Sequence, residues 1–157
     1  MAGTLLEGLS RYLGNEELSR LAAPRIGFAG CGGIGSNAAL MLARSGVRRF
    51  LLVDHDTVDA SNLNRQQFMP RDVGRPKAEA LRDRLLELDP GLDIDARVKK
   101  LTEQNADRYV PLADIWVEAF DAPECKRFLV ERVMMAGKRV VSASGLGGWG
   151  GPPMRRR

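Results

Sequence analysis

The fold is decided by the stretch Arg25–Ser36, whose sequence is RIGFAGCGGIGS. Residues 25–29 form a short apolar run that predicts a buried parallel strand, and residues 36–45 predict the helix that follows it. The glycines at positions 30, 32 and 35 fit the dinucleotide-binding fingerprint, in which a tight turn lets backbone N–H groups at a helix N-terminus approach phosphate. The stretch therefore predicts a strand, a turn and a helix that hold a nucleotide.

The rest of the chain alternates strand and helix patterns. Further strands are predicted at residues 49–53, 93–98, 114–120 and 138–144, and further helices at residues 77–88, 102–111 and 124–135. Leucines at helical spacing predict two short helices in residues 4–13 and 15–21. Strict alternation predicts an α/β fold, which is a Rossmann-like, doubly wound and mostly parallel sheet preceded by N-terminal helices.

We divide the chain into an N-terminal helical segment (residues 1–24), a nucleotide-binding domain (residues 25–151) and a basic tail (residues 152–157). The glycine- and proline-rich residues 145–153 predict a mobile loop. A fifth strand followed only by such a loop indicates a domain that is truncated at its C-terminus.

Composition narrows the class of protein. The chain has 157 residues, 44% of them hydrophobic and 28% charged, as expected for one globular domain. The net charge of +4 depends largely on three terminal arginines, so a nucleic-acid partner is not expected. Cys31 and Cys125 lie far apart and outside any Cys-x-x-Cys pair, so no zinc site is expected. No apolar run approaches the roughly 20 residues of a membrane span, and no signal peptide is evident, so we expect a cytoplasmic protein.

Acidic residues follow two of the predicted strands. Asp54 comes 19 positions after Gly35, close to the roughly 20 that place a carboxylate on the ribose hydroxyls; the alternative is an Asp that only caps a loop. Asp121 follows the fourth strand. Because ligands bind outside the carboxyl ends of parallel strands, we expect both carboxylates to converge on the glycine turn.

Two cations and an amide indicate a triphosphate. Arg65 and Lys77 can neutralise several phosphate oxygens, and Asn62 adds a donor. Asp121 is then the natural magnesium ligand, since Mg²⁺ bound to phosphates needs only one or two carboxylates. On spacing alone, Arg65 and Lys77 could equally be solvated surface cations.

Five blocks together resemble the adenylating domain of ThiF, MoeB and the ubiquitin-activating enzymes. The compact ThiF-like proteins of thiamine biosynthesis look most similar. The blocks are Gly30-x-Gly32-Gly33-x-Gly35-Ser36, Val53-Asp54-x-Asp56-x-Val58, Ser61-Asn62-Leu63-Asn64-Arg65-Gln66, Gly74-Arg75-Pro76-Lys77 and Glu118-Ala119-Phe120-Asp121.

The resemblance implies ATP-dependent adenylation of the C-terminal glycine carboxylate of a ubiquitin-like, ThiS-like sulfur carrier, in thiamine or sulfur-cofactor biosynthesis by a homodimer. It implies catalytic roles for Arg65, Lys77 and Asp121, with Asp121 on magnesium. The residues that it implies for ATP are Gly30, Gly32, Gly33, Gly35, Asp54, Asp56, Asn62, Arg65, Gln66 and Lys77.

Some features depart from the family pattern. Larger relatives carry zinc-binding cysteine pairs and a downstream reactive cysteine, whereas we expect Cys31 and Cys125 to serve in packing. Only Arg11-Tyr12 echoes the N-terminal element that supplies an arginine to a partner's ATP. Three alternatives stay open: an enzyme like tRNA threonylcarbamoyladenosine dehydratase, a nucleotide- or carrier-binding module without turnover, and an NAD dehydrogenase, which Arg65 and Lys77 disfavour.

Overall fold

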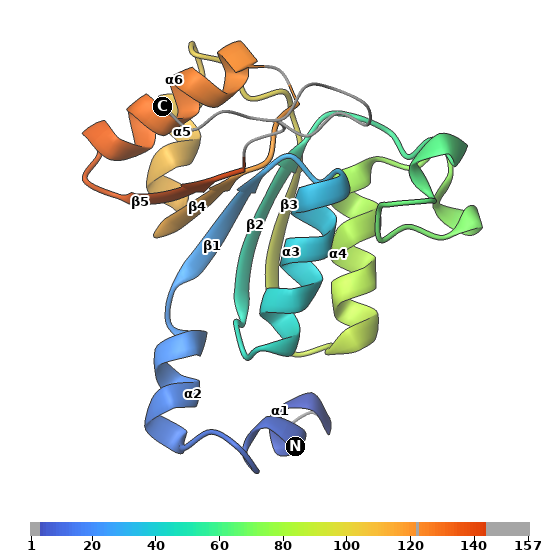
Figure 1. The fold of residues 1–157 in the computed structure, drawn as a ribbon, viewed down its shortest axis with the longest axis vertical. Coiled ribbons are helices and arrows are strands. Elements are labelled where there is room, and N and C mark those ends of the chain that lie inside the picture. The colour runs from blue at the N-terminus through green and yellow to red at the C-terminus, as the bar shows by residue number, and fades with distance from the viewer. Residues whose placement is uncertain (1–3, 122, 144–157) are drawn as a thin grey trace, which may run out of the picture.

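The computed structural model describes residues 4–121 and 123–143, and within them the chain forms one parallel sheet (Figure 1). The strand order is β3-β2-β1-β4-β5, so the chain steps outward from β1 first to one side and then to the other. This order confirms the Rossmann-like α/β prediction. The strands are β1 (Arg25–Ala29), β2 (Arg49–Asp54), β3 (Asp93–Val98), β4 (Ile115–Glu118) and β5 (Arg139–Ser142).

Helices cover both faces of the sheet. Helices α3 (Gly33–Arg44) and α4 (Lys77–Leu88) lie on one face, and α5 (Ala106–Tyr109) and α6 (Pro123–Met135) lie on the other (Figure 1). Alternate residues of each strand pack against the helices on opposite faces of the sheet, because successive side chains of a strand point to opposite faces. Phe28 and Phe50 join the core under α3 and α4, whereas Leu51 and Trp116 join the core under α6.

The N-terminal helices lie beyond the amino end of the sheet, away from the carboxyl ends of its strands (Figure 1). They are α1 (Thr4–Leu9) and α2 (Asn15–Ala22), and neither contains a fully buried residue. Leucines 9, 18 and 21 pack around Gly46, where a Cβ would lie 3.4 to 3.7 Å from them. The φ of Gly46 is +108°, which also favours glycine at this position.

Most element bounds agree with the sequence prediction to within one residue, and five differ by more. Helix α1 ends at Leu9 rather than residue 13, and β5 spans Arg139–Ser142 rather than residues 138–144. Helix α3 begins at Gly33, three residues earlier than predicted. The helix predicted at residues 102–111 is only α5, followed by the 3₁₀ turn Val110–Leu112. Strand β4 ends at Glu118 rather than residue 120, because the Phe120 N–H bonds to the Glu118 carboxylate instead of to a neighbouring strand.

Other predictions fall on residues that lie outside the described ranges. These are the loop at residues 145–153 and the basic tail at residues 152–157. Across the described helices, none is both long enough and apolar enough to cross a membrane.

Candidate functional site

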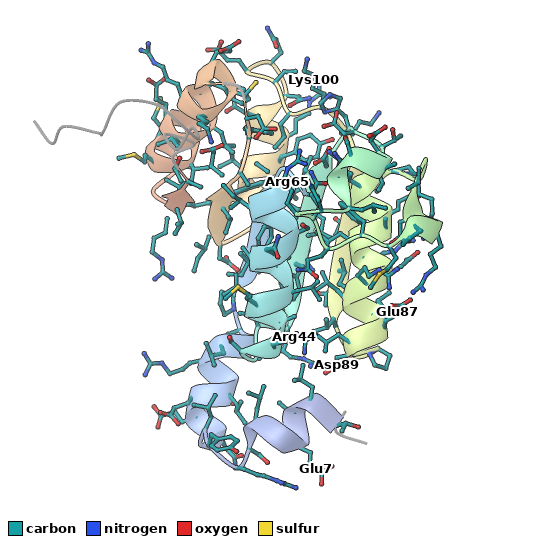
Figure 2. All side chains as sticks on the ribbon, turned by 45° about the vertical axis from the view of Figure 1, so that its right-hand side comes forward. Glu7, Arg44, Arg65, Glu87, Asp89 and Lys100 are labelled. Carbon is teal, nitrogen blue, oxygen red and sulfur yellow. The ribbon has the colours of Figure 1, made fainter. Side chains whose placement is uncertain are left out.

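A cavity of about 600 Å³ opens at the carboxyl ends of the strands, where the sequence predicted a ligand site. Figure 2 shows Arg65 and Lys100 at this end of the molecule and Asp89 and Glu7 toward the other. The lining comes from the glycine turn and from the segments that follow β2, β3 and β4. It consists of Gly30, Gly32, Gly33, Ile34, Val53, Asp54, His55, Asp56, Arg65, Gln66, Lys77, Lys99, Lys100, Leu101, Ala119, Phe120, Asp121 and Cys125.

Two glycines make the turn possible. Gly30 has a φ of +100°, and a Cβ there would lie 2.8 Å from the Ala119 carbonyl oxygen. A Cβ on Gly35 would lie only 2.0 Å from the Gly30 carbonyl oxygen. Gly35 itself does not line the cavity. Its lack of a side chain lets the first turn of α3 close onto the end of β1, which leaves the N-terminus of α3 beside the cavity.

Asp54 fixes this turn from the end of β2. One carboxylate oxygen accepts the Cys31 N–H at 2.7 Å, and the other accepts the Asp56 N–H at 2.8 Å. Asp54 is buried yet borders the cavity. Burial, together with the nearby Asp54 charge, raises the pKa of the Cys31 thiol well above its usual range. Cys31 is therefore a packing residue, as the sequence indicated, because a protonated thiol is a poor nucleophile.

Lys77 comes to the cavity from the first turn of α4. Its ammonium group is mostly buried and lies 3.4 Å from a carboxylate oxygen of Asp56. The Lys77 N–H also donates to the Asp56 carbonyl at 2.9 Å. Between the two residues the chain makes an excursion of about twenty residues, closed by hydrogen bonds between Val58 and the 74–75 backbone. This closure holds the predicted lysine and aspartate together.

The Asn-Leu-Asn-Arg-Gln segment is only partly at the cavity. Arg65 lines it with an exposed side chain, whose guanidinium donates to the Ser61 carbonyl at 2.9 Å. Asn62 is not among the lining residues. Its side-chain oxygen accepts the Asp59 N–H at 3.0 Å and so caps the 3₁₀ turn Ala60–Asn62. Its contact with a nucleotide stays a prediction.

Gln66 has an unsatisfied polar atom in the cavity wall. The side chain is nine-tenths buried, and among the described residues its Oε1 has no hydrogen-bond partner. Buried polar atoms are normally paired, so Gln66 keeps one unsatisfied acceptor beside the cavity, and its side chain would have to shift to present that buried acceptor to a ligand.

The structure adds lining residues that the sequence analysis did not select. Lys99 and Lys100 follow β3, and the Lys99 N–H donates to the Asp54 carbonyl at 3.1 Å. The rule that ligands lie outside the carboxyl ends of strands, applied to the third strand, would have found them. Asn37 of α3 was also missed. Its amide donates to the carbonyl oxygens of Gly33 and Arg65 and so ties α3 to the Arg65 segment.

Asp121 lies where the sequence placed it, after β4 and exposed to the cavity. Among the described residues, the wall therefore combines a helix N-terminus and four cationic side chains with three carboxylates. Such a surface suits a polyphosphate whose sugar and metal ion need acidic partners. The four cations are Arg65, Lys77, Lys99 and Lys100, and the three carboxylates are Asp54, Asp56 and Asp121.

Residues 6–155 match the ThiF family, and the chain belongs to this family of adenylyltransferase-like proteins. It is 33% identical over 135 residues to tRNA threonylcarbamoyladenosine dehydratase of Bacillus subtilis, covering 85% of this chain and 53% of the relative. It is 36% identical over 128 residues to the adenylyltransferase and sulfurtransferase UBA4 of Emericella nidulans, covering 81% of this chain and 27% of that protein. The chain thus spans about half the length of the bacterial relative, and less of the fungal one.

Solved structures agree with this assignment. The dehydratase TcdA of E. coli superposes with a TM-score of 0.86 at 29% identity, covering 92% of this chain and 61% of that one. TcdA in complex with ATP gives a TM-score of 0.85 at 30% identity, covering 90% and 59%. E. coli MccB with ATP gives 0.72 at 27% identity, covering 81% and 39%.

Proposed function

We propose that the chain binds ATP in this cavity and transfers AMP to a carboxylate, with release of pyrophosphate. The observation that carries the proposal is the joining of the glycine turn, Asp54 and Lys77 around one cavity at the strand ends. Support comes from TcdA, which has been solved in complex with ATP and with AMP.

In the proposed reaction, a carboxylate oxygen attacks the α-phosphorus of ATP. The bond from that phosphorus to the bridging oxygen breaks, and the electron pair leaves with pyrophosphate. The carboxylate is its own nucleophile, so no general base is needed, and catalysis depends on positioning and charge neutralisation. Backbone N–H groups of the turn and the cations Arg65 and Lys77 would hold the phosphates. Asp54 would accept from the ribose hydroxyls.

Asp121 would hold magnesium in this site. It is an exposed carboxylate on the cavity wall, and Mg²⁺ on a nucleotide characteristically uses one or two carboxylates plus phosphate oxygens. When bound, the ion would supply neutralisation of phosphate charge. Cys125, four residues further on, also lines the cavity but is assigned no step.

The carboxylate that accepts AMP is a separate question. The sequence alone favoured the C-terminal glycine of a ThiS-like carrier, but the comparisons favour the alternative, a tRNA threonylcarbamoyladenosine dehydratase-like enzyme. We therefore propose the carboxylate of that modified adenosine as the leading acceptor. Lys99 and Lys100, two exposed lining residues, would face the tRNA backbone. The carrier remains second, supported by the likeness to UBA4.

Exchange of labelled pyrophosphate into ATP tests both acceptors. We expect exchange when threonylcarbamoyladenosine-containing tRNA is added, and less with a carrier that ends in Gly-Gly. Exchange with the carrier but not with the tRNA would favour the ThiS-like carrier as the acceptor. If calorimetry detects ATP binding but neither acceptor supports exchange, we would conclude that the chain is a binding module without turnover. Sedimentation equilibrium would test the predicted homodimer.

Cysteine labelling gives a direct test of where the nucleotide binds. Cys31 is fully buried with a raised pKa, whereas Cys125 is half-buried at the cavity. We expect N-ethylmaleimide to modify Cys125 and spare Cys31 in the folded protein, and ATP to slow the modification of Cys125. Mass spectrometry of the peptides checks this. Labelling of Cys125 at the same rate with and without saturating ATP would place the nucleotide elsewhere.

A further inference from the structure

A buried ion pair lies directly behind the cavity wall that carries Asp121. Glu118, the last residue of β4, is fully buried, and the side chain of Lys126 from α6 is 22% exposed. The Lys126 ammonium nitrogen lies 3.2 Å from Oε1 and 3.3 Å from Oε2 of Glu118. Neither residue lines the cavity, and the proposed reaction uses neither of them.

The Glu118 carboxylate joins three segments of the chain. It accepts the Phe120 N–H at 2.7 Å and the hydroxyl of Ser142, which is its cross-strand neighbour on β5. Lys126 also donates to the Ala143 carbonyl at 2.9 Å. The loop after β4, the end of β5 and the first half of α6 are thus fastened at one point.

The fastened loop contacts the glycine turn. The Ala119 N–H donates to the Ala29 carbonyl at 2.9 Å, and the Ala119 carbonyl packs against Gly30. The Ala119 Cβ lies 3.6 Å from where a Cβ of Gly35 would be. Because interiors are close-packed, a displacement of this loop would displace the turn as well as Asp121.

We propose that Glu118 and Lys126 are positioning residues, which hold residues 119–121 so that Asp121 and the glycine turn meet the metal–nucleotide at the right distance. The inference rests on the proposed function. It predicts a local effect on magnesium and nucleotide, beyond the general loss of stability that follows when one partner of a buried pair is removed.

The test compares Lys126→Met with a matched control, Arg48→Met. Arg48 is 20% exposed and pairs with the buried carboxylate of Asp89, so each variant leaves a buried carboxylate without its cationic partner. Asp89 lies far from the cavity end that Arg65 and Lys100 mark (Figure 2). Two quantities are measured: the Mg²⁺ concentration that gives half-maximal thermal stabilisation by ATP, and hydrogen exchange of the Phe120 amide without nucleotide.

We expect both variants to lower the unfolding midpoint. Only Lys126→Met should raise the half-saturating Mg²⁺ concentration, by about tenfold or more, the range seen when residues that orient metal ligands are changed. Phe120 exchange should accelerate only in that variant. An equal Mg²⁺ requirement in the two variants, or unchanged Phe120 exchange, overturns the proposal.

A milder variant covers the case in which Lys126→Met does not fold. Ser142→Ala removes one donor to Glu118 and keeps the ion pair. It should shift both measurements in the same direction by a smaller factor, and no shift contradicts the proposal. If the wild-type protein is not stabilised by ATP at all, the proposed function fails, whereas Phe120 exchange still decides whether the pair positions the loop.

Discussion

Gly35→Ala should abolish nucleotide binding and unfold the protein at much lower temperature or urea concentration. A Cβ at this position would lie 2.0 Å from the Gly30 carbonyl oxygen and 2.9 Å from its carbon, both of which are backbone atoms. No side-chain rotation can relieve such an overlap, so the turn or the start of α3 must move. We expect a loss at or above the upper end of the roughly 1–3 kcal/mol that overpacking costs.

Gly33→Ala is the matched control for stability. It lies two residues earlier in the same helix turn, and its Cβ would meet nothing nearer than the Arg65 side chain at 3.8 Å. This substitution should leave the unfolding midpoint unchanged or raise it slightly, because alanine restricts the unfolded chain. Urea titrations of both variants measure the difference. A Gly35→Ala protein as stable as Gly33→Ala would show that the turn is not closed by this contact.

Lys77→Met should lower the rate of ATP–pyrophosphate exchange by about 100-fold or more, as the loss of one preorganised charged donor commonly does. Lys77 is a mostly buried cation in the cavity wall, where a lower dielectric strengthens its interaction with phosphate. The variant should remain folded, since methionine keeps most of the apolar length of the side chain.

Arg71→Met serves as the control for net charge. Arg71 is exposed, pairs with Glu87 and does not line the cavity. The Arg71→Met variant removes the same unit of charge as Lys77→Met. Its exchange rate should stay within about twofold of the wild-type rate, because exposed ion pairs contribute little. A second comparison separates two roles of Lys77: if it acts only by holding Asp56, then Asp56→Asn will reproduce the whole effect. Similar rates for Lys77→Met and wild type would remove Lys77 from the catalytic residues.

The parallel sheet was predictable because its strands carry an unambiguous pattern. Strands β1 and β3 and helix α4 have the bounds that apolar periodicity and Pro76 indicate. The same logic placed the glycine turn, Asp54 and Asp121 at one edge of the sheet. These are local signals, each read from a few consecutive residues, combined with one topological rule.

The rest of the site depends on contacts between residues distant in sequence. Residues 56–76 carry no periodicity, so only the structure shows that the hydrogen bonds of Val58 return the chain to Lys77. Spacing likewise could not show that Asn62 caps its own 3₁₀ turn while Arg65 reaches the cavity. In the sequence, Glu118 was only one residue of the Glu-Ala-Phe-Asp motif. Its structural role was not predictable, because its partners lie 8 and 24 residues further along the chain.

The division of the core by the sheet has a consequence for the lifetime of the protein. Among the described residues, one hydrophobic cluster lies under α3 and α4 and the other under α6, with the sheet between them. The cavity is lined from both sides, so a bound nucleotide would bridge two layers whose described residues belong to separate hydrophobic clusters.

Ligand that binds only the folded state adds about 2.7 kcal/mol of stability when present at 100 times its Kd. Partial unfolding of either layer would then require release of the nucleotide. We expect resistance to proteolysis to rise with ATP concentration. The rate at which this protein is degraded in the cell would then depend on the supply of ATP as well as on the stability that its own sequence gives it.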